Sequence, residues 1–167
     1  LTRAYGAYRM IGSWLYGQIG QGDWRRYSWV APDAAGTHEG YKQYDSLTIA
    51  GHKVPCSLLN EEEWKELPAY VNTKFRPANG NRADAYAGQF ISLPLMRVEE
   101  MKFIDMECTA HLDGVAAGVA ALNSFVNTYR YTDNSYQANA TTMDEFVKEL
   151  MIQKRIEFWG EGITYFD

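Results

Sequence analysis

Two carboxylates near the end of the chain have a spacing that could support acid-base chemistry. Glu157 and Glu161 lie four residues apart in KRIEFWGEGITYFD, residues 154–167. On a helix this spacing places the two Cβ atoms about 5 to 6 Å apart. Retaining glycosidases use two carboxyl groups about 5 Å apart. A glycoside hydrolase that uses this pair, or other Asp and Glu residues of the first half, is therefore one hypothesis.

The cations beside these carboxylates favour a structural interpretation. Lys154 and Arg155 lie within about one helical turn of Glu157 and Glu161. A fixed cation stabilises the ionised carboxylate, whereas a general acid must keep its proton. Structural ion-pair networks often have the same composition as active sites. We therefore predict that the ending is an ion-paired structural element and that the protein is not an enzyme.

Three helices are predicted to position this ending. The first runs from about Leu95 to Cys108 after Pro94, and we expect its apolar stripe to face the core. This stripe consists of Val98, Met101, Ile104 and Cys108, widened by Phe103 and Met106. Because Cys108 falls on the stripe, core packing is a better interpretation for it than reactivity, and with Cys56 it permits one disulfide without implying it.

The second and third helices follow from their caps and periodicity. Asp113 is a candidate N-cap for a helix with apolar residues at 115, 119, 122, 126 and 129. The third helix starts with the capping box Thr142 to Glu145 and continues to Gly160. The short link from His111 to Gly114 predicts that the first two helices form an antiparallel hairpin.

Residues 1–91 follow a different pattern. Glycines and turn residues recur there, no helical period persists, and only short strand-like runs such as residues 70–75 are present. We predict a single domain, 1–167, with an irregular loop-rich part at 1–91 and a helical part at 92–167. The fold class is mainly α, with TPR-like stacked helical hairpins, long irregular aromatic-rich loops and a few short strands.

Composition excludes several classes of partner. The formal net charge is -5 and no run of Lys or Arg could neutralise a row of phosphates, so we expect no nucleic-acid partner. No apolar stretch approaches the roughly 20 residues of a membrane-spanning helix. The first residues lack Met and a signal h-region, so we expect an internal or processed piece. His38, His52 and His111 have no metal-ligand spacing, and we expect no metal or cofactor.

The helical half carries a combined pattern of short motifs. It comprises SLPLMRVEEMKFIDMECTAHLDGVAAGVAALN, residues 92–123, and the ending described above. This pattern resembles the C-terminal region of the SusD/RagB family of outer-membrane nutrient-binding lipoproteins. Asp23-Trp24-Arg25-Arg26 and the run 72–75 match the family more loosely. The residues that match the strong pattern are Arg97, Glu100, Glu107, Leu122, Asn123, Arg155, Glu157, Phe158, Glu161, Gly162, Phe166 and Asp167.

The resemblance implies binding without turnover. Members of the family are lipid-anchored at the cell surface, where they capture oligosaccharides or other nutrients. They deliver these ligands to a SusC-like TonB-dependent outer-membrane transporter during polysaccharide utilization. The resemblance thus implies a glycan or other nutrient ligand, a transporter partner, and a membrane association through an N-terminal lipid that this chain lacks.

Aromatic residues of the irregular half are the candidate ligand surface. Sugar rings have apolar faces and polar rims, which suit flat aromatic platforms beside amides and carboxylates. Packing between loop and core is the alternative role for each ring, above all for Trp24 in its family-like motif. A third hypothesis is a helical-repeat module that binds only protein partners. The candidate ligand-binding residues are Trp14, Trp29, Tyr41, Tyr44 and Trp64.

Overall fold

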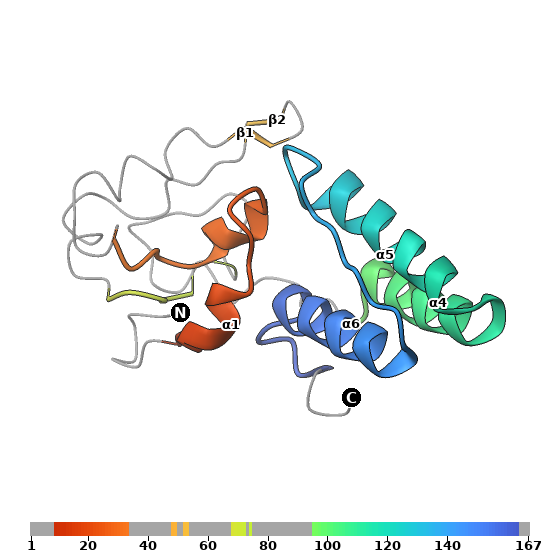
Figure 1. The fold of residues 1–167 in the computed structure, drawn as a ribbon. Coiled ribbons are helices and arrows are strands. Elements are labelled where there is room, and N and C mark those ends of the chain that lie inside the picture. The colour runs from red at the N-terminus through yellow and green to blue at the C-terminus, as the bar shows by residue number, and fades with distance from the viewer. Residues whose placement is uncertain are drawn as a thin grey trace. The chain divides into compact units, whose positions relative to one another are not determined.

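The computed structural model describes residues 9–33, 48–49, 52–53, 68–72, 74 and 95–163, and this part of the chain is mainly helical (Figure 1). The chain divides into two compact units. The first comprises Leu1–Tyr16 and Arg26–Leu93, and the second comprises Gly17–Arg25 and Pro94–Asp167. Every helix within the described ranges is too short or too polar to span a bilayer.

Short elements make up the described portion of the first unit. They are α1 (Ser13–Gly17), η1 (Trp24–Ser28), which begins in the second unit, and the antiparallel pair β1 (Thr48–Ile49) and β2 (His52–Lys53). In the predicted strand-like run from residue 70, Val71 and Asn72 form isolated bridges with Met10 and Trp29 respectively. This segment therefore lies between two others, and its pairing buries Val71 and Trp29 at 1% exposure each.

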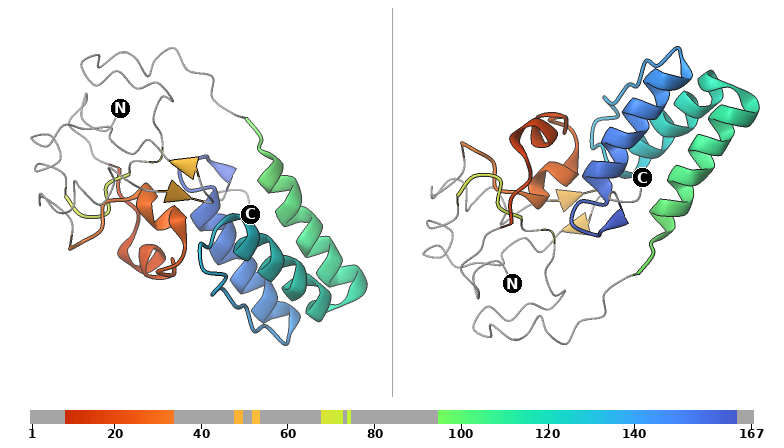
Figure 2. Two further views of the ribbon diagram at one scale, coloured as in Figure 1. Left: turned by 90° about the horizontal axis from the view of Figure 1, so that it is seen from above. Right: turned by 90° about the horizontal axis from the view of Figure 1, so that it is seen from below.

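The described residues of the second unit contain three α-helices. They are α4 (Val98–Asp113), α5 (Val115–Tyr129) and α6 (Met143–Glu157), and each contacts the other two. Figure 2 shows α4 and α5 running side by side after a tight turn, as the short link predicted. The core between them contains Phe103, Leu122, Val126, Phe146, Leu150 and Phe158, all fully buried.

One predicted helix start is confirmed and another is wrong. The capping box of α6 is confirmed, because Thr142 accepts a hydrogen bond from the Glu145 backbone N–H and the Glu145 side chain accepts one from that of Thr142. The predicted N-cap at Asp113 is wrong, since this residue still belongs to α4. Gly114, with a φ of 99°, caps both helices, because a turn this tight needs a left-handed residue that glycine adopts at low cost.

The orientation of α4 differs from the expectation. Its buried residues are Phe103, Met106 and Ala110. Phe103 and Met106, which were predicted to widen the stripe, are thus buried as expected. The centre of the predicted stripe is exposed instead, at 68% for Val98, 52% for Met101 and 41% for Ile104, and Cys108 is an exposed free thiol. Apolar residues occupy two faces of α4, and α5 and α6 cover the face that carries the large Phe103 ring.

Two asparagines of α5 hold the connection between α5 and α6. The amide of Asn127 accepts from the backbone N–H of Tyr136 at 3.1 Å and donates to its carbonyl at 2.9 Å. Asn123 contacts Ala138 in the same way, at 2.7 and 3.3 Å. Asn123 and Asn127 are four residues apart, which is a rise of about 6 Å along a helix and is close to the length of two residues of extended chain. Their spacing therefore fits that of Ala138 and Tyr136 in an extended segment. This gives Asn123, a residue of the family-like pattern, a structural role.

Candidate functional site

Glu157 is the centre of a buried arginine and carboxylate cluster. Arg130 donates from Nε to Oε2 at 2.8 Å and from Nη2 to Oε1 at 2.9 Å. Arg97 Nη1 donates to Oε1 at 3.1 Å, and Arg25 Nη1 donates to Oε2 at 3.2 Å. The Glu157 side chain is 5% exposed. Three guanidinium groups therefore occupy both oxygens of one buried carboxylate.

Further carboxylates complete the cluster. Arg97 forms a bidentate pair with Glu161, at 2.9 and 3.0 Å, and also donates to the Glu157 carbonyl at 3.0 Å. Glu99 lies 3.1 Å from Arg130 and 3.2 Å from Arg97. Asp23 pairs with Arg25 through several hydrogen bonds, the shortest at 2.6 Å. We call these seven residues the Glu157 cluster: Asp23, Arg25, Arg97, Glu99, Arg130, Glu157 and Glu161.

The hairpin topology explains why these groups meet. Arg97 precedes the first residue of α4, and Arg130 follows the last residue of α5. An antiparallel pair places these two ends together, and Glu157, the last residue of α6, meets them there. Arginines beside the carboxyl ends of α5 and α6 also interact favourably with the helix dipoles. The cluster therefore ties the ends of three helices to the segment that contains Arg25.

The arginines keep Glu157 ionised. Burial by itself raises the pKa of Glu157, but the hydrogen bonds and charge of Arg130, with the charges of Arg25 and Arg97, outweigh it and lower the pKa to about 2. A general acid near neutral pH needs the opposite shift. Both Glu157 and Glu161 accept hydrogen bonds from Arg97, and the lowered pKa of Glu157 is the opposite of what proton donation to a glycosidic oxygen needs.

This shift predicts how stability depends on pH. Because the folded-state pKa of Glu157 lies below its ordinary value of 4.5, its ionisation stabilises the fold fully above that value. The stabilisation is lost as pH falls from 4.5 toward about 2. We expect the urea midpoint to fall in this window, and to fall less in Glu157→Gln, whose amide does not titrate. Equal slopes for the two proteins would contradict the assignment.

A polar chain extends from the cluster along α6. Arg25 Nη2 donates to Gln153 Oε1 at 2.6 Å, and Gln153 Nε2 donates to Glu149 at 3.1 Å. The hydroxyl of Tyr136 donates to the same Glu149 oxygen at 2.6 Å. Burial, followed by the hydrogen bond and charge of Glu149, raises the pKa of Tyr136. The phenol therefore stays protonated, and the chain fixes the connection between α5 and α6.

The candidate aromatic residues have different surroundings. Trp14 in α1 is 59% exposed, whereas Trp29 is 1% exposed and has no face open to a ligand in this structure. Trp24 donates from Nε1 to the Tyr129 carbonyl at 2.8 Å and lies under the guanidinium of Arg130, in agreement with a structural role. The other three candidates, Tyr41, Tyr44 and Trp64, lie outside the described residues.

The family-like residues also separate into groups. Arg97, Glu157 and Glu161 meet in the Glu157 cluster. Glu100 and Glu107 lie on α4 at intermediate exposure, and Arg155 is exposed on α6. Asp167 lies outside the described residues.

Sequence reasoning paired Glu157 with none of the three arginines that hold it, although Arg97 was part of the family-like pattern. It named Lys154 and Arg155, which are its neighbours in sequence, whereas Arg25 and Arg130 come from distant segments. For Arg25 a signal existed, because the run from Asp23 to Arg26 had matched the family pattern. For Arg130 the sequence contained no such signal, since an Arg after an apolar helix is common.

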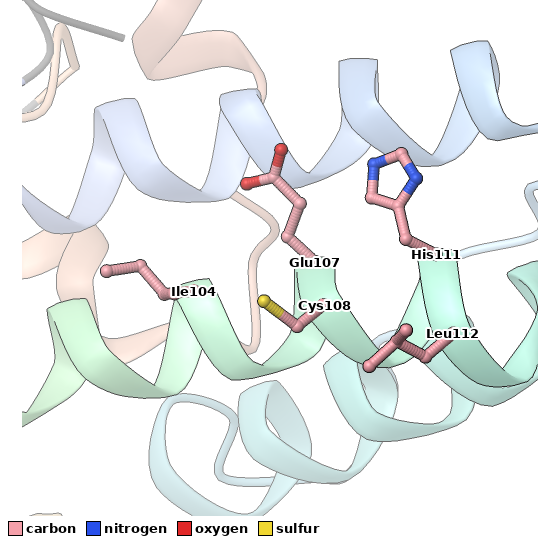
Figure 3. Close-up of a pocket in the computed structure, with 5 residues that line it drawn as sticks. All are labelled: Ile104, Glu107, Cys108, His111 and Leu112. Carbon is pink, nitrogen blue, oxygen red and sulfur yellow. The ribbon is translucent and has the colours of Figure 1, made fainter.

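One open depression lies on α4. It has a volume of about 370 Å³, and its lining side chains all belong to this helix (Figure 3). They are Ile104, Glu107, Cys108, His111 and Leu112. Among the residues that the structure describes, no group of three or more His, Cys, Asp or Glu side chains is placed to hold a metal ion.

Comparison with known proteins adds no relative. No family model matches the sequence, and no curated protein or solved structure is significantly similar to it.

Proposed function

We propose that this chain is part of a non-catalytic nutrient-binding protein of the SusD-like type, which captures an oligosaccharide or another nutrient at the cell surface. The proposal includes delivery of the ligand to a TonB-dependent transporter of the outer membrane. Its starting point is the resemblance carried by residues 92–167. The buried, arginine-bound state of Glu157 supports binding over hydrolysis, because both carboxylate oxygens already accept hydrogen bonds from the protein.

The observation that carries ligand binding is the exposed ring of Trp14. The side chain is 59% exposed on α1, and the glycines at both sides, Gly12 and Gly17, have open space where a Cβ would lie. The exposed fraction of Trp14 leaves surface on which a sugar ring can stack. Stacking of an apolar sugar face on an exposed indole is favourable because it removes both surfaces from water.

The same proposal gives the helical unit a supporting role. We propose that α4, α5 and α6 are one and a half repeats of a TPR-like stack, in which α4 and α5 form a hairpin and α6 begins the next one. The contacts among all three helices support this arrangement. In such a protein the Glu157 cluster stabilises the scaffold, and ligand contacts come from the aromatic residues of the first unit.

Replacement of Trp14 by Ala tests the ligand surface. Loss of about 1.5 kcal/mol of stacking corresponds to roughly ten-fold weaker binding. We expect Trp14→Ala to lose most of the retardation that a soluble polysaccharide causes in native affinity gels. Tyr129→Ala is the matched control, since Tyr129 is 52% exposed in the other unit and should leave the retardation unchanged.

Two outcomes would contradict the proposed function. The first is the absence of retardation and of any tryptophan fluorescence change across a broad glycan panel. The second is release of reducing ends by the wild-type protein, abolished in Glu157→Gln while circular dichroism shows an intact fold. That result would establish the glycoside hydrolase instead.

A helical-repeat module that binds a protein partner is the second candidate function. The observation that favours it is the exposed apolar side of α4, where Val98 is 68% and Leu112 is 83% exposed. In that case substitutions on α4 should abolish partner binding, and Trp14→Ala should leave it unchanged.

A further inference from the structure

Residues 20–25, which belong to the second unit, form a short segment that we call the strap. Its backbone pairs with the chain that follows α5. The Trp24 N–H donates to the Arg130 carbonyl at 2.9 Å, and the Thr132 N–H donates to the Gly22 carbonyl at 3.0 Å. These two bonds run in opposite directions, as they do between antiparallel strands, so the strap is attached as a short added strand.

Two side chains of the strap add hydrogen bonds to the ends of the helices. The Trp24 indole donates from Nε1 to the Tyr129 carbonyl at 2.8 Å. Arg25 donates to Gln153 at 2.6 Å and to Glu157 at 3.2 Å, and both of these acceptors belong to α6. The strap thereby supplies donors to carbonyls at the end of α5, which have no acceptor role left within the helix.

The apolar core of the three helices is assembled without the strap. Among the described residues, none of those that form this core or pack against it lies between positions 20 and 25. The fully buried residues of the strap are Asp23 and Arg25, and both are charged. Because burial of apolar surface is the dominant stabilising contribution to a core, departure of the strap leaves most of that contribution in place.

Charge balance also allows the strap to leave as one piece. Arg25 has its own counter-ion, because Asp23 accepts hydrogen bonds from its Nε at 3.0 and 3.1 Å and from its Nη2 at 2.6 Å. On the helical side, Glu157 keeps both oxygens paired with Arg130 and one of them also with Arg97. Separation therefore leaves no buried charge without an opposite charge, which is the situation that makes breaking an internal ion pair costly.

We propose that the strap is a detachable element, which opens as one piece while α4, α5 and α6 stay folded. Segments that are held by few apolar contacts open at a lower free energy than the core of a protein. Opening uncovers the carbonyls at the end of α5 together with Gln153 and Glu157. This group of acceptors at the carboxyl ends of two helices favours a cationic donor, which in the closed state is Arg25.

Native-state hydrogen exchange of the full chain, followed by NMR, tests the opening. We expect similar protection factors for the Trp24 and Thr132 amides, at least ten-fold lower than those of Leu122 and Val126 in α5, because opening breaks both bonds of the strap at once. The Arg130 amide donates to the Val126 carbonyl at 2.8 Å within the helix and should keep the higher protection.

Two results of this measurement would overturn the proposal. Equal protection of the strap amides and the α5 amides would show that the strap leaves only when the whole unit unfolds. Low protection of the Arg130 amide would show that the end of α5 frays, so that loss of the bonds to the strap would follow from the helix and not from the strap.

A reversible disulfide tests whether the strap itself must move. A Cβ at Gly22 would lie 2.8 Å from Cγ of Asp133, which places the two Cβ atoms within about 4.5 Å, as a disulfide requires. In a Cys56→Ser/Cys108→Ser background, oxidised Gly22→Cys/Asp133→Cys should raise the protection of the strap amides at least ten-fold. The reduced form of the same protein is the matched control and should exchange as the background does. Strap amides that exchange at the same rate in both forms would contradict the proposal.

Removal of one donor tests the attachment without a new covalent bond. Trp24→Phe keeps an aromatic ring but loses the indole N–H, so we expect the strap amides to exchange about five-fold faster and the α5 amides to be unchanged. Tyr129→Phe is the matched control, because Tyr129 binds the strap through its carbonyl and its side chain is 52% exposed. It should change neither group of amides. Equal acceleration of both groups in Trp24→Phe would show that the strap and the helices open together.

Discussion

Glu157→Gln is expected to lower the free energy of unfolding by about 3 to 5 kcal/mol, because it breaks a buried ion-pair network from one side. The amide keeps the shape of the side chain but carries no charge, and its nitrogen cannot accept a hydrogen bond. Arg25 and Arg130, with side chains 5% and 9% exposed, then keep their charges in the interior beside fewer carboxylates. Urea unfolding followed by circular dichroism measures the loss.

A matched control separates the cluster from a general effect of charge. Glu107→Gln removes the same charge from a partly exposed position on α4, and we expect it to change stability by less than about 0.5 kcal/mol. If the two variants lost equal stability, the Glu157 cluster would not be a stabilising network. A smaller loss in Glu161→Gln is expected, since Glu161 is paired with Arg97, whose side chain is 24% exposed.

Local signals in the sequence predicted the helical frame well. Thr142 and Glu145 form the capping box that their spacing indicated, and the positive φ angles at Gly160 and Gly162 follow α6 as the glycine pair indicated. Each of these features depends on hydrogen bonds or backbone angles within a few residues. Such features can be predicted from the local sequence without knowledge of the rest of the fold.

Features that depend on tertiary contacts were not predictable in the same way. Periodicity showed that α4 has apolar residues on more than one side, but it could not decide which side α5 and α6 would cover. The structure buries Phe103 and leaves Met101 exposed. Likewise, the electrostatic role of the ending was predicted, whereas its partners Arg25 and Arg130 are separated from Glu157 by 132 and 27 residues. No pattern confined to residues 154–167 contains that information.

Gly118→Leu is expected to destabilise the protein by about 3 kcal/mol, because α4 and α5 are in close contact at this glycine. A Cβ at Gly118 would lie 2.5 Å from the Cβ of Ala110, and 3.0 Å from its Cα and from the ring of Phe146. The Cα of Ala110 is backbone, so the two helices would have to separate and open the core. Glycine is a poor helix former, and the gain in propensity of nearly 1 kcal/mol offsets only part of this cost. Ala120→Leu, on the exposed side of α5, is the control for adding a Leu side chain to this helix and should leave thermal stability within a few degrees of wild type. A Gly118→Leu variant as stable as this control would show that the hairpin is not closely packed here.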